Sequence, residues 1–337
     1  MSIAPYDYRK PLIPYAIDWT FHAQQHIAPP PPELSYRGCV NTPEQHTHLR
    51  QLHPIEQCLE NPPLEGSYGP TRIELCVRDT IRVDDKHNAQ LAVVEVLAAE
   101  PPVGGLVQGT HVVAKLYDPL YVDDEGLTMN PFMISDQAYT CEVATYNVLP
   151  DLQGAKIPRY FGSYSLDIPV ELPDGIPATR SVRLILIECI LGSCMRDIDP
   201  DEIPQPARQN IMRSIIEFET LVYSRHAHLR DLHPRNIMLT KTGDIVFVDF
   251  GDTWFASTNT FTAKKFQWLS SKWVSPILRW HEARTRMFRE HDFYAWIDWD
   301  WQPWLETEFQ HTAASITPEM QKRFLSARLL ERYYRTQ

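Results

Sequence analysis

The sequence predicts an α+β protein of two lobes, with a strand-rich first lobe that contains one helix and a helical second lobe. Between residues 71 and 188, runs of β-branched and apolar residues alternate with turn signals. After residue 190 the apolar residues recur at helical spacing instead, and eight of the nine tryptophans lie beyond residue 250. A hydrophobic content of 43% can build a sizeable core.

The first 70 residues are expected to form an irregular extension. They contain a run of four prolines at 29–32 and show weak hydrophobic periodicity. Such a segment packs on the surface of a folded body or stays partly mobile. We therefore divide the chain into an extension at 1–70, a first lobe at 71–188 and a second lobe at 189–337.

The first lobe is predicted to contain five strands and one helix. The strands are expected at 72–83, 89–97, 111–117, 158–166 and 181–188, where β-branched and apolar residues lie between turn signals. Ser135 can cap a helix that runs to about Leu149 and ends at Pro150. Glu142 and Tyr146 lie one turn apart on that helix, so they share a face.

The second lobe is predicted to be mainly helical, with one short hairpin. Apolar residues recur at helical spacing from 206 to 226. Two short strands follow at 236–239 and 245–248, joined by the turn 241–244. The rest of the chain is aromatic and mostly helical in pattern. We expect its tryptophans to pack in the core rather than to line an aromatic substrate pocket.

Charge and cysteine content exclude several classes of protein. The net charge of −11 argues against nucleic acid as a partner, because phosphate backbones require a basic surface. The sequence has neither a run of roughly 18 apolar residues nor an apolar leader, so no membrane span and no signal peptide are predicted. The six cysteines form no CxxC pair, which favours free thiols in a cytoplasmic protein. The oligomeric state is left open.

The most informative stretch is HLRDLHPRNIMLTKTGDIVFVDFGD, at residues 228–252. Asp231 lies five residues before Asn236, and Asp249 follows the second strand of the hairpin. Because the hairpin folds back, it can bring the three side chains together. Oxygen ligands of this kind suit Mg²⁺, and a carboxylate beside the metal can orient or deprotonate a hydroxyl nucleophile. The alternative for Asp231 and Asn236 is a solvated turn.

These residues resemble the motifs of the protein-kinase-like superfamily, whose catalytic loop is D-x-x-x-x-N and whose metal motif is D-F-G. The resemblance covers roughly residues 71–255. It implies a bilobal kinase-like fold with ATP and Mg²⁺ as cofactors. Carried over by position, Asp231 is the catalytic base, and Asn236 and Asp249 are the metal ligands.

The same resemblance assigns roles in the first lobe. Lys115, in Val-Ala-Lys on a predicted strand, would contact the α- and β-phosphates, and Glu142 would be its ion-pair partner. Backbone groups near Glu188 and Ile190 would contact the adenine edge. The alternatives are an edge-strand charge for Lys115 and an exposed helical carboxylate for Glu142.

Three details indicate a branch other than regulated protein kinases. His233 stands where protein kinases usually have lysine, Leu229 stands where they have histidine, and no A-P-E motif follows the D-F-G. The run DLHPRN is more similar to aminoglycoside- and choline-kinase-like small-molecule phosphotransferases. The segments 273–280 and 296–306 resemble uncharacterised fungal kinase-like proteins.

The sequence departs from the family at the loop that would cover the phosphates. There is no glycine between Thr71 and Val103, and the expected loop tip consists of Asp-Asp-Lys-His-Asn at 84–88. Glycines would let backbone amides approach phosphate closely. Without them Lys86, or the neighbouring His87 or Asn88, would have to donate instead.

Histidines and one cysteine near the N-terminus could suggest a metal site. His46, His48, His53 and Cys58 match no standard zinc spacing, so we favour loop histidines. His233 and the other histidines around the catalytic loop are expected to make structural hydrogen bonds, and the alternative for His233 is a contact with substrate or phosphate.

The sequence therefore predicts an ATP- and Mg²⁺-dependent phosphotransferase that acts on the hydroxyl of a small-molecule substrate, with neither nucleic acid nor a membrane as partner. One alternative is a pseudokinase-like module that binds a nucleotide or a partner. Another is a kinase-fold enzyme that transfers a different group or phosphorylates protein, because a fold does not determine a reaction.

Overall fold

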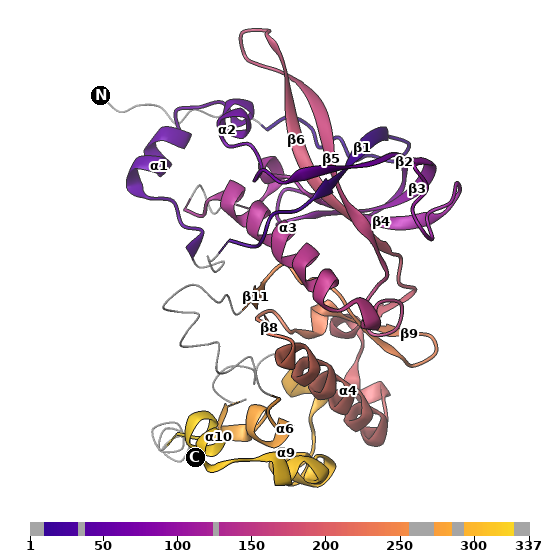
Figure 1. Ribbon diagram of the computed structural model, residues 1–337, viewed down its shortest axis with the longest axis vertical. Coiled ribbons are helices and arrows are strands. Elements are labelled where there is room, and N and C mark those ends of the chain that lie inside the picture. The colour runs from indigo at the N-terminus through magenta and orange to yellow at the C-terminus, as the bar shows by residue number, and fades with distance from the viewer. Residues whose placement is uncertain (1–9, 33–37, 124–127, 256–272, 285–292, 327–337) are drawn as a thin grey trace. The chain divides into compact units, whose positions relative to one another are not determined.

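The computed structural model describes residues 10–32, 38–123, 128–255, 273–284 and 293–326. These residues form a mixed α and β structure with a large antiparallel sheet (Figure 1). The chain divides into two compact units. The first unit comprises residues 1–189 together with Asp249–Asp252, and the second comprises 190–248 and 253–337.

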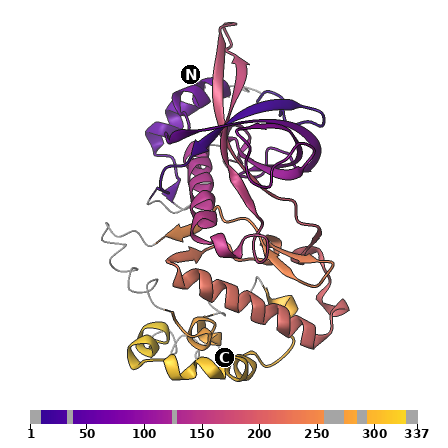
Figure 2. The same cartoon turned by 45° about the vertical axis from the view of Figure 1, so that its right-hand side comes forward.

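The first unit is built on a closed sheet of six antiparallel strands (Figures 1 and 2). The strands are β1 (Thr20–Ile27), β2 (Ser67–Arg82), β3 (Gln90–Glu100), β4 (His111–Tyr117), β5 (Tyr160–Glu171) and β6 (Pro177–Glu188). Their order is β1-β2-β3-β4-β6-β5, and the pairing of β1 with β5 closes the sheet. Each of the five strands expected in this region is present, and β5 and β6 extend several residues beyond their predicted ends.

The register of the sheet separates an inner face from an outer face. Ala92, Ala114 and Leu186 lie in one cross-strand row, and all three are fully buried in the core of this unit. Because side chains alternate along a strand, Lys115 projects to the opposite, outer face. The outer face of β4 therefore carries the first candidate site residue.

Helix α3 (Pro131–Val148) contacts β4 and β6 and buries most of its length. It begins four residues before the predicted start at Ser135, which lies buried inside the helix. Asn130 is the actual cap, since its side chain accepts from the Met133 amide at 2.9 Å, and Pro131 occupies the first helical position. An asparagine cap followed by proline is a strong start signal that Ser135 does not have.

The N-terminal segment is not irregular as expected, because it contains β1, α1 (Pro43–Leu49) and α2 (Pro54–Glu60). Both short helices begin with a capping box, built on Thr42 for α1 and on His53 for α2. In β1 the side chains alternate between buried and exposed, and Phe21 and Ala23 enter the core. Pairing with β2 and β5, rather than its own composition, makes this polar segment a strand.

The second unit is mainly helical and contains two small sheets. Its longest helix is α4 (Gln205–Ser224), close to the predicted 206–226. The hairpin of β9 (Ile237–Thr240) and β10 (Ile245–Phe247) is joined by β7 (Gly192–Cys194), and β8 (Ala227–Leu229) pairs with β11 (Thr253–Phe255). Further helical elements among the described residues are α6 (Pro276–Arg279), α9 (Trp301–Glu308), α10 (Pro318–Phe324) and the short 3-10 turns η7 (Tyr294–Trp296) and η8 (Gln310–Ser315).

The tryptophans of this unit pack against one another and against its interior. Trp280 and Trp296 are buried. Trp301 packs between Trp280 and Trp304, with ring centroids 6.3 and 5.1 Å away. The prediction of core packing is confirmed for Trp280 and Trp296 but is wrong for Trp273, which is 42% exposed, and Trp268 lies outside the described residues.

None of the helices that the structure describes combines the length and the apolar character needed to cross a lipid bilayer.

Candidate functional site

Three of the predicted site residues meet in the first unit. The Nζ atom of Lys115 lies 2.5 Å from Oε2 of Glu142 and 2.7 Å from Oδ1 of Asp249. Lys115 comes from the outer face of β4 and Glu142 from the buried face of α3. We call these three residues the Lys115 cluster. The interpretations of Lys115 as an edge-strand charge and of Glu142 as an exposed carboxylate are wrong, since both side chains are buried and paired.

Backbone conformation and packing hold Asp249 in position within the segment Asp249–Asp252. Asp249 has a φ of 63°, a left-handed conformation that aspartate tolerates better than most residues. Phe250 is buried and packs edge-on against Tyr146 of α3, with ring centroids 5.5 Å apart. A Cβ at Gly251 would lie 3.2 Å from the Cβ of Ala138, so the segment approaches α3 closely.

The electrostatics of the Lys115 cluster follow from burial and from the count of charges. Burial disfavours the ammonium of Lys115, but the charges of Asp249 and Glu142 outweigh it and raise the lysine pKa. Burial raises the pKa of Glu142 despite the attraction of Lys115. For Asp249 the burial penalty is outweighed by Lys115, so its pKa is lowered. Two carboxylates therefore share one ammonium, and the ionised cluster carries one excess negative charge.

Exposure distinguishes Asp249 from its partners. The side chains of Lys115 and Glu142 are 5% and 0% exposed, whereas that of Asp249 is 36% exposed. Asp249 is thus the member of the cluster that a bound cation can reach.

Tyr117, which motif comparison does not mark, donates from its hydroxyl to Oε2 of Glu142 at 2.7 Å. Its position two residues after Lys115 on the same strand is the signal that could have identified it.

The other predicted catalytic residues lie in the second unit, in residues 231–236, which we call the Asp231 loop. Nδ2 of Asn236 donates at 2.9 Å both to the carbonyl and to Oδ2 of Asp231. Arg235 forms an ion pair with Oδ1 of the same carboxylate. A simple solvated turn does not describe this loop, because both oxygens of Asp231 have partners. Sequence reasoning missed Arg235, although its i+4 spacing from Asp231 is visible.

His233 stabilises the Asp231 loop. Its side chain caps the 3-10 turn η6 (Pro234–Asn236) by accepting from the Arg235 amide at 3.1 Å. The expected structural role is confirmed for this histidine. The cap fixes the backbone that carries Arg235 and Asn236.

Asn236 and Asp249 each suit a hard cation. The two hydrogen bonds from Nδ2 fix the amide of Asn236, so its carbonyl oxygen is the atom left to bind a ligand. Asp249 offers a partly exposed carboxylate within a cluster of excess negative charge. Carboxylate and amide oxygens are ligands that Mg²⁺ accepts. In the part of the chain that the structure describes, no group of three or more His, Cys, Asp or Glu side chains could hold a metal.

The predicted phosphate-covering loop is closed by its own side chains. Oδ1 of Asp84 accepts from the Lys86 amide at 2.8 Å and contacts Nδ1 of His87 at 2.7 Å. The Asp84 amide donates to Oε1 of Gln90 at 2.8 Å. These contacts use two of the backbone donors at the loop tip. The Lys86 side chain itself is exposed.

The residues predicted to contact adenine are at the end of β6. The Glu188 amide donates to the Arg159 carbonyl at 2.9 Å, so this amide is not free to donate to a base. The Glu188 carboxylate accepts from the Arg159 amide at 3.0 Å. Ile190 is the first residue of the second unit and is half-buried.

The N-terminal histidines have contacts of their own. His48 lies 2.7 Å from a carboxylate oxygen of Glu60, and His53 caps α2 by accepting from the Ile55 amide. Cys58 is buried on α2. These residues lie on or next to the short helices rather than in a loop.

Comparison with known proteins provides no family assignment. No protein-family model matches the sequence, and no curated protein matches it. The contacts described above are therefore the basis for a functional interpretation.

Proposed function

We propose that the protein is an ATP- and Mg²⁺-dependent phosphotransferase of bilobal protein-kinase-like fold that acts on a small-molecule hydroxyl. The observation that carries this proposal is the Lys115 cluster. A buried lysine, 2.5 Å from a helical carboxylate and 2.7 Å from the aspartate of an Asp-Phe-Gly segment, suits the binding of a metal-bound polyphosphate. An ion cluster with excess negative charge is costly to bury unless a cation compensates for it.

Each residue has a defined role in this proposal. Lys115 positions the phosphates, and Glu142 fixes the direction of the lysine. Asp249 and Asn236 hold Mg²⁺, which neutralises phosphate charge when bound. Asp231 orients the acceptor hydroxyl. Catalysis is then mainly positioning and charge neutralisation, as in phosphoryl transfer generally.

The chain connects the two sets of residues directly. Asp249 follows Val248 in the sequence, and the Val248 amide donates to the main-chain carbonyl of Asn236 at 2.9 Å. This bond fixes the strand that leads to Asp249 against the residue proposed as its partner ligand. It supports a shared role for the hairpin and the Asp-Phe-Gly segment.

A second candidate is a module that binds nucleotide without transferring phosphate. The ion pair between Asp231 and Arg235 favours it, because the guanidinium occupies an oxygen of the carboxylate that would orient the acceptor hydroxyl. The closed loop at 84–88 favours it as well. Both candidates require binding of Mg²⁺ and ATP, and they differ in turnover.

Replacement of Asp249 by asparagine tests the metal site. Wild-type protein should gain stability with Mg-ATP, by about 2.7 kcal/mol when the ligand is at 100 times its Kd. Asp249→Asn should lose most of this gain, because the amide keeps an acceptor for Lys115 but removes the charge that attracts Mg²⁺. Asp167→Asn is the matched control, since Asp167 is exposed on β5 and contacts Ser181.

Thermal unfolding with and without Mg-ATP measures the effect, and release of phosphate from ATP separates the two candidates. An Asp249→Asn variant that kept the full wild-type gain would refute the metal assignment. A wild-type protein that showed no gain at millimolar Mg-ATP would refute the proposed function. Binding without phosphate release would select the second candidate.

A further inference from the structure

A β-bulge places a second cation on the outer face of the sheet beside Lys115. In the pairing of β2 with β3, Thr80 lies opposite Ala92 and Arg82 lies opposite Leu91, so the register shifts between Thr80 and Arg82. Without the shift, Ile81 would lie opposite Leu91. A bulge of this kind redirects a side chain. Here it gives an outward position to an arginine at the end of β2.

The next strand extends the row to Lys115. Leu91 of β3 lies opposite Lys115 of β4. Directly opposed residues of antiparallel strands project to the same face. Arg82, Leu91 and Lys115 therefore share one face, with the two cations on either side of a leucine.

Arg82 has an unsatisfied donor. Its Nε atom is buried and makes no hydrogen bond within the residues that the structure describes. An unmade hydrogen bond of a buried group is costly, and in a native protein it calls for an explanation. Arg82 also lies close enough to Asp249 for its charge to help lower the aspartate pKa, after the effects of burial and Lys115. The free donor is thus near the Lys115 cluster.

The loop after Arg82 does not supply the donors that a phosphate needs. The amides of Asp84 and Lys86 are already bonded to side chains of the loop and its flanks. The carboxylate of Asp84 would repel an anion. With these two amides already bonded, a donor elsewhere on this face would complement Lys115 in holding a phosphate.

We propose that Arg82 and Lys115 form a two-cation site for the phosphates of a nucleoside triphosphate, in which the Arg82 guanidinium takes the place of a glycine-rich loop. The inference rests on the proposed function, because it names the residue that binds the phosphates of the same nucleotide. Guanidinium suits this role, since its planar donors can bind two phosphate oxygens at once.

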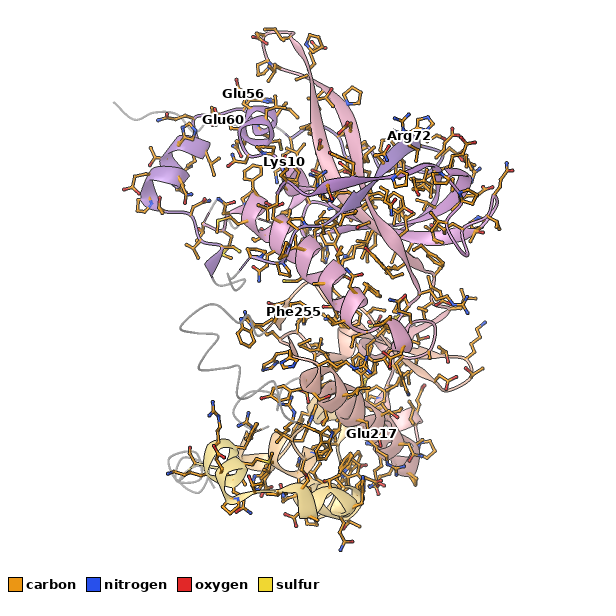
Figure 3. All side chains as sticks on the ribbon, viewed as in Figure 1. Lys10, Glu56, Glu60, Arg72, Glu217 and Phe255 are labelled. Atoms are coloured by element: carbon orange, nitrogen blue, oxygen red, sulfur yellow. The ribbon has the colours of Figure 1, made fainter. Side chains whose placement is uncertain are left out.

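The test compares Arg82→Gln with Arg72→Gln, its matched control. Arg72 lies ten residues before Arg82 on β2 and is exposed, with its Nε donating to Oε1 of Gln24 (Figure 3). Binding of Mg-ATP, adenosine and inorganic tripolyphosphate is measured by calorimetry on each folded variant. Arg82→Gln should weaken Mg-ATP and tripolyphosphate about 10- to 100-fold, as expected for loss of a charge-assisted hydrogen bond. Adenosine affinity should not change, and Arg72→Gln should behave as wild type.

Arg82→Lys provides a second measurement of Mg-ATP affinity that does not depend on whether Arg82→Gln folds. It keeps the charge but loses the planar donors, so it should weaken Mg-ATP less than Arg82→Gln and still measurably. Equal Mg-ATP affinity in wild type, Arg82→Gln and Arg82→Lys would overturn the inference while the proposed function stands.

The tripolyphosphate measurement tests the two-cation site separately from the proposed function. If wild type binds tripolyphosphate in an Arg82-dependent way but does not bind Mg-ATP, the anion site is supported and the proposed function fails. If wild type binds neither ligand, both fail.

Discussion

The Lys115 cluster and the Asp231 loop hold their carboxylates in opposite ways. In the cluster, Lys115 and Glu142 are buried by the sheet and α3, and the Lys115 ammonium pairs with the carboxylates of both Glu142 and Asp249. In the loop, the Asp231 side chain is 35% exposed, and its partners Arg235 and Asn236 come from the same short segment. Buried charges depend on their partners far more strongly than exposed ones do. The cluster should therefore govern stability, whereas Asp231 in the loop should govern turnover.

The largest effect is expected from Lys115→Met. The substitution leaves Glu142 fully buried without its cation, which should destabilise the protein by about 3–5 kcal/mol. The loss should be smaller at acidic pH, because protonation removes the carboxylate charges. Chemical denaturation at pH 5 and pH 8 measures both effects.

The control adds Glu142→Gln to Lys115→Met. The double variant no longer buries an uncompensated carboxylate, so it should recover a large part of the lost stability. A single variant as stable as wild type would show that the cluster does not hold the first unit together.

The next effect, on turnover, is expected from Asp231→Asn. Loss of a general base or hydroxyl-orienting group should lower Mg²⁺-dependent phosphate release from ATP about 100-fold or more. Stability should change by less than about 1 kcal/mol, because the ion pair with Arg235 is partly exposed to solvent. Asp244→Asn, in the hairpin turn beside Thr242, is the control. A stability loss as large as that of Lys115→Met would remove the contrast between the two regions.

The smallest effect concerns Asp136, a second carboxylate on α3. Burial raises its pKa to about 6, against a hydrogen bond from the Leu64 amide that lowers it. The folded state then binds the proton more tightly than the unfolded state, so Asp136 should reduce stability as pH rises from about 4 to about 6. Asp136→Asn keeps the acceptor for Leu64. It should remove this pH dependence and stabilise the protein by about 1–2 kcal/mol above pH 6.

Melting temperatures of wild type, Asp136→Asn and the exposed Asp167→Asn between pH 4 and pH 8 check this. Parallel curves for wild type and Asp136→Asn would contradict it. The result would show whether burial of the Asp136 carboxylate on α3 reduces stability.

The sequence predicted those features that depend on local pattern. The strand of Lys115 and the helix of Glu142 were predicted from their residue pattern, whereas their ion pair was expected only from the resemblance to kinase-like motifs. The Asp231–Asn236 spacing is equally local, and the structure holds both side chains together. The start of α3 was wrong by one turn because the Asn130–Pro131 signal was overlooked.

Features that depend on distant partners could not be predicted. The segment of β1 is polar and becomes a strand only through pairing with β2 and β5. The bulge before Arg82 arises from the register of β2 on β3, which no spacing in the sequence reveals. Arg82 consequently carries no motif, although it shares a face with Lys115.

Asp249–Asp252 belong to the first unit but follow most of its sequence by many residues, which determines when the Lys115 cluster can form during synthesis. Synthesis runs from the N-terminus, so Lys115 and Glu142 can pair while the ribosome is still making the second unit. Asp249 lies 134 residues after Lys115, so the third member of the cluster arrives only after α4 and the β9–β10 hairpin have been translated. A nascent chain that ends soon after Cys189 has its six strands but no Asp-Phe-Gly segment. The complete Lys115 cluster can therefore form only after the β9–β10 hairpin has been translated.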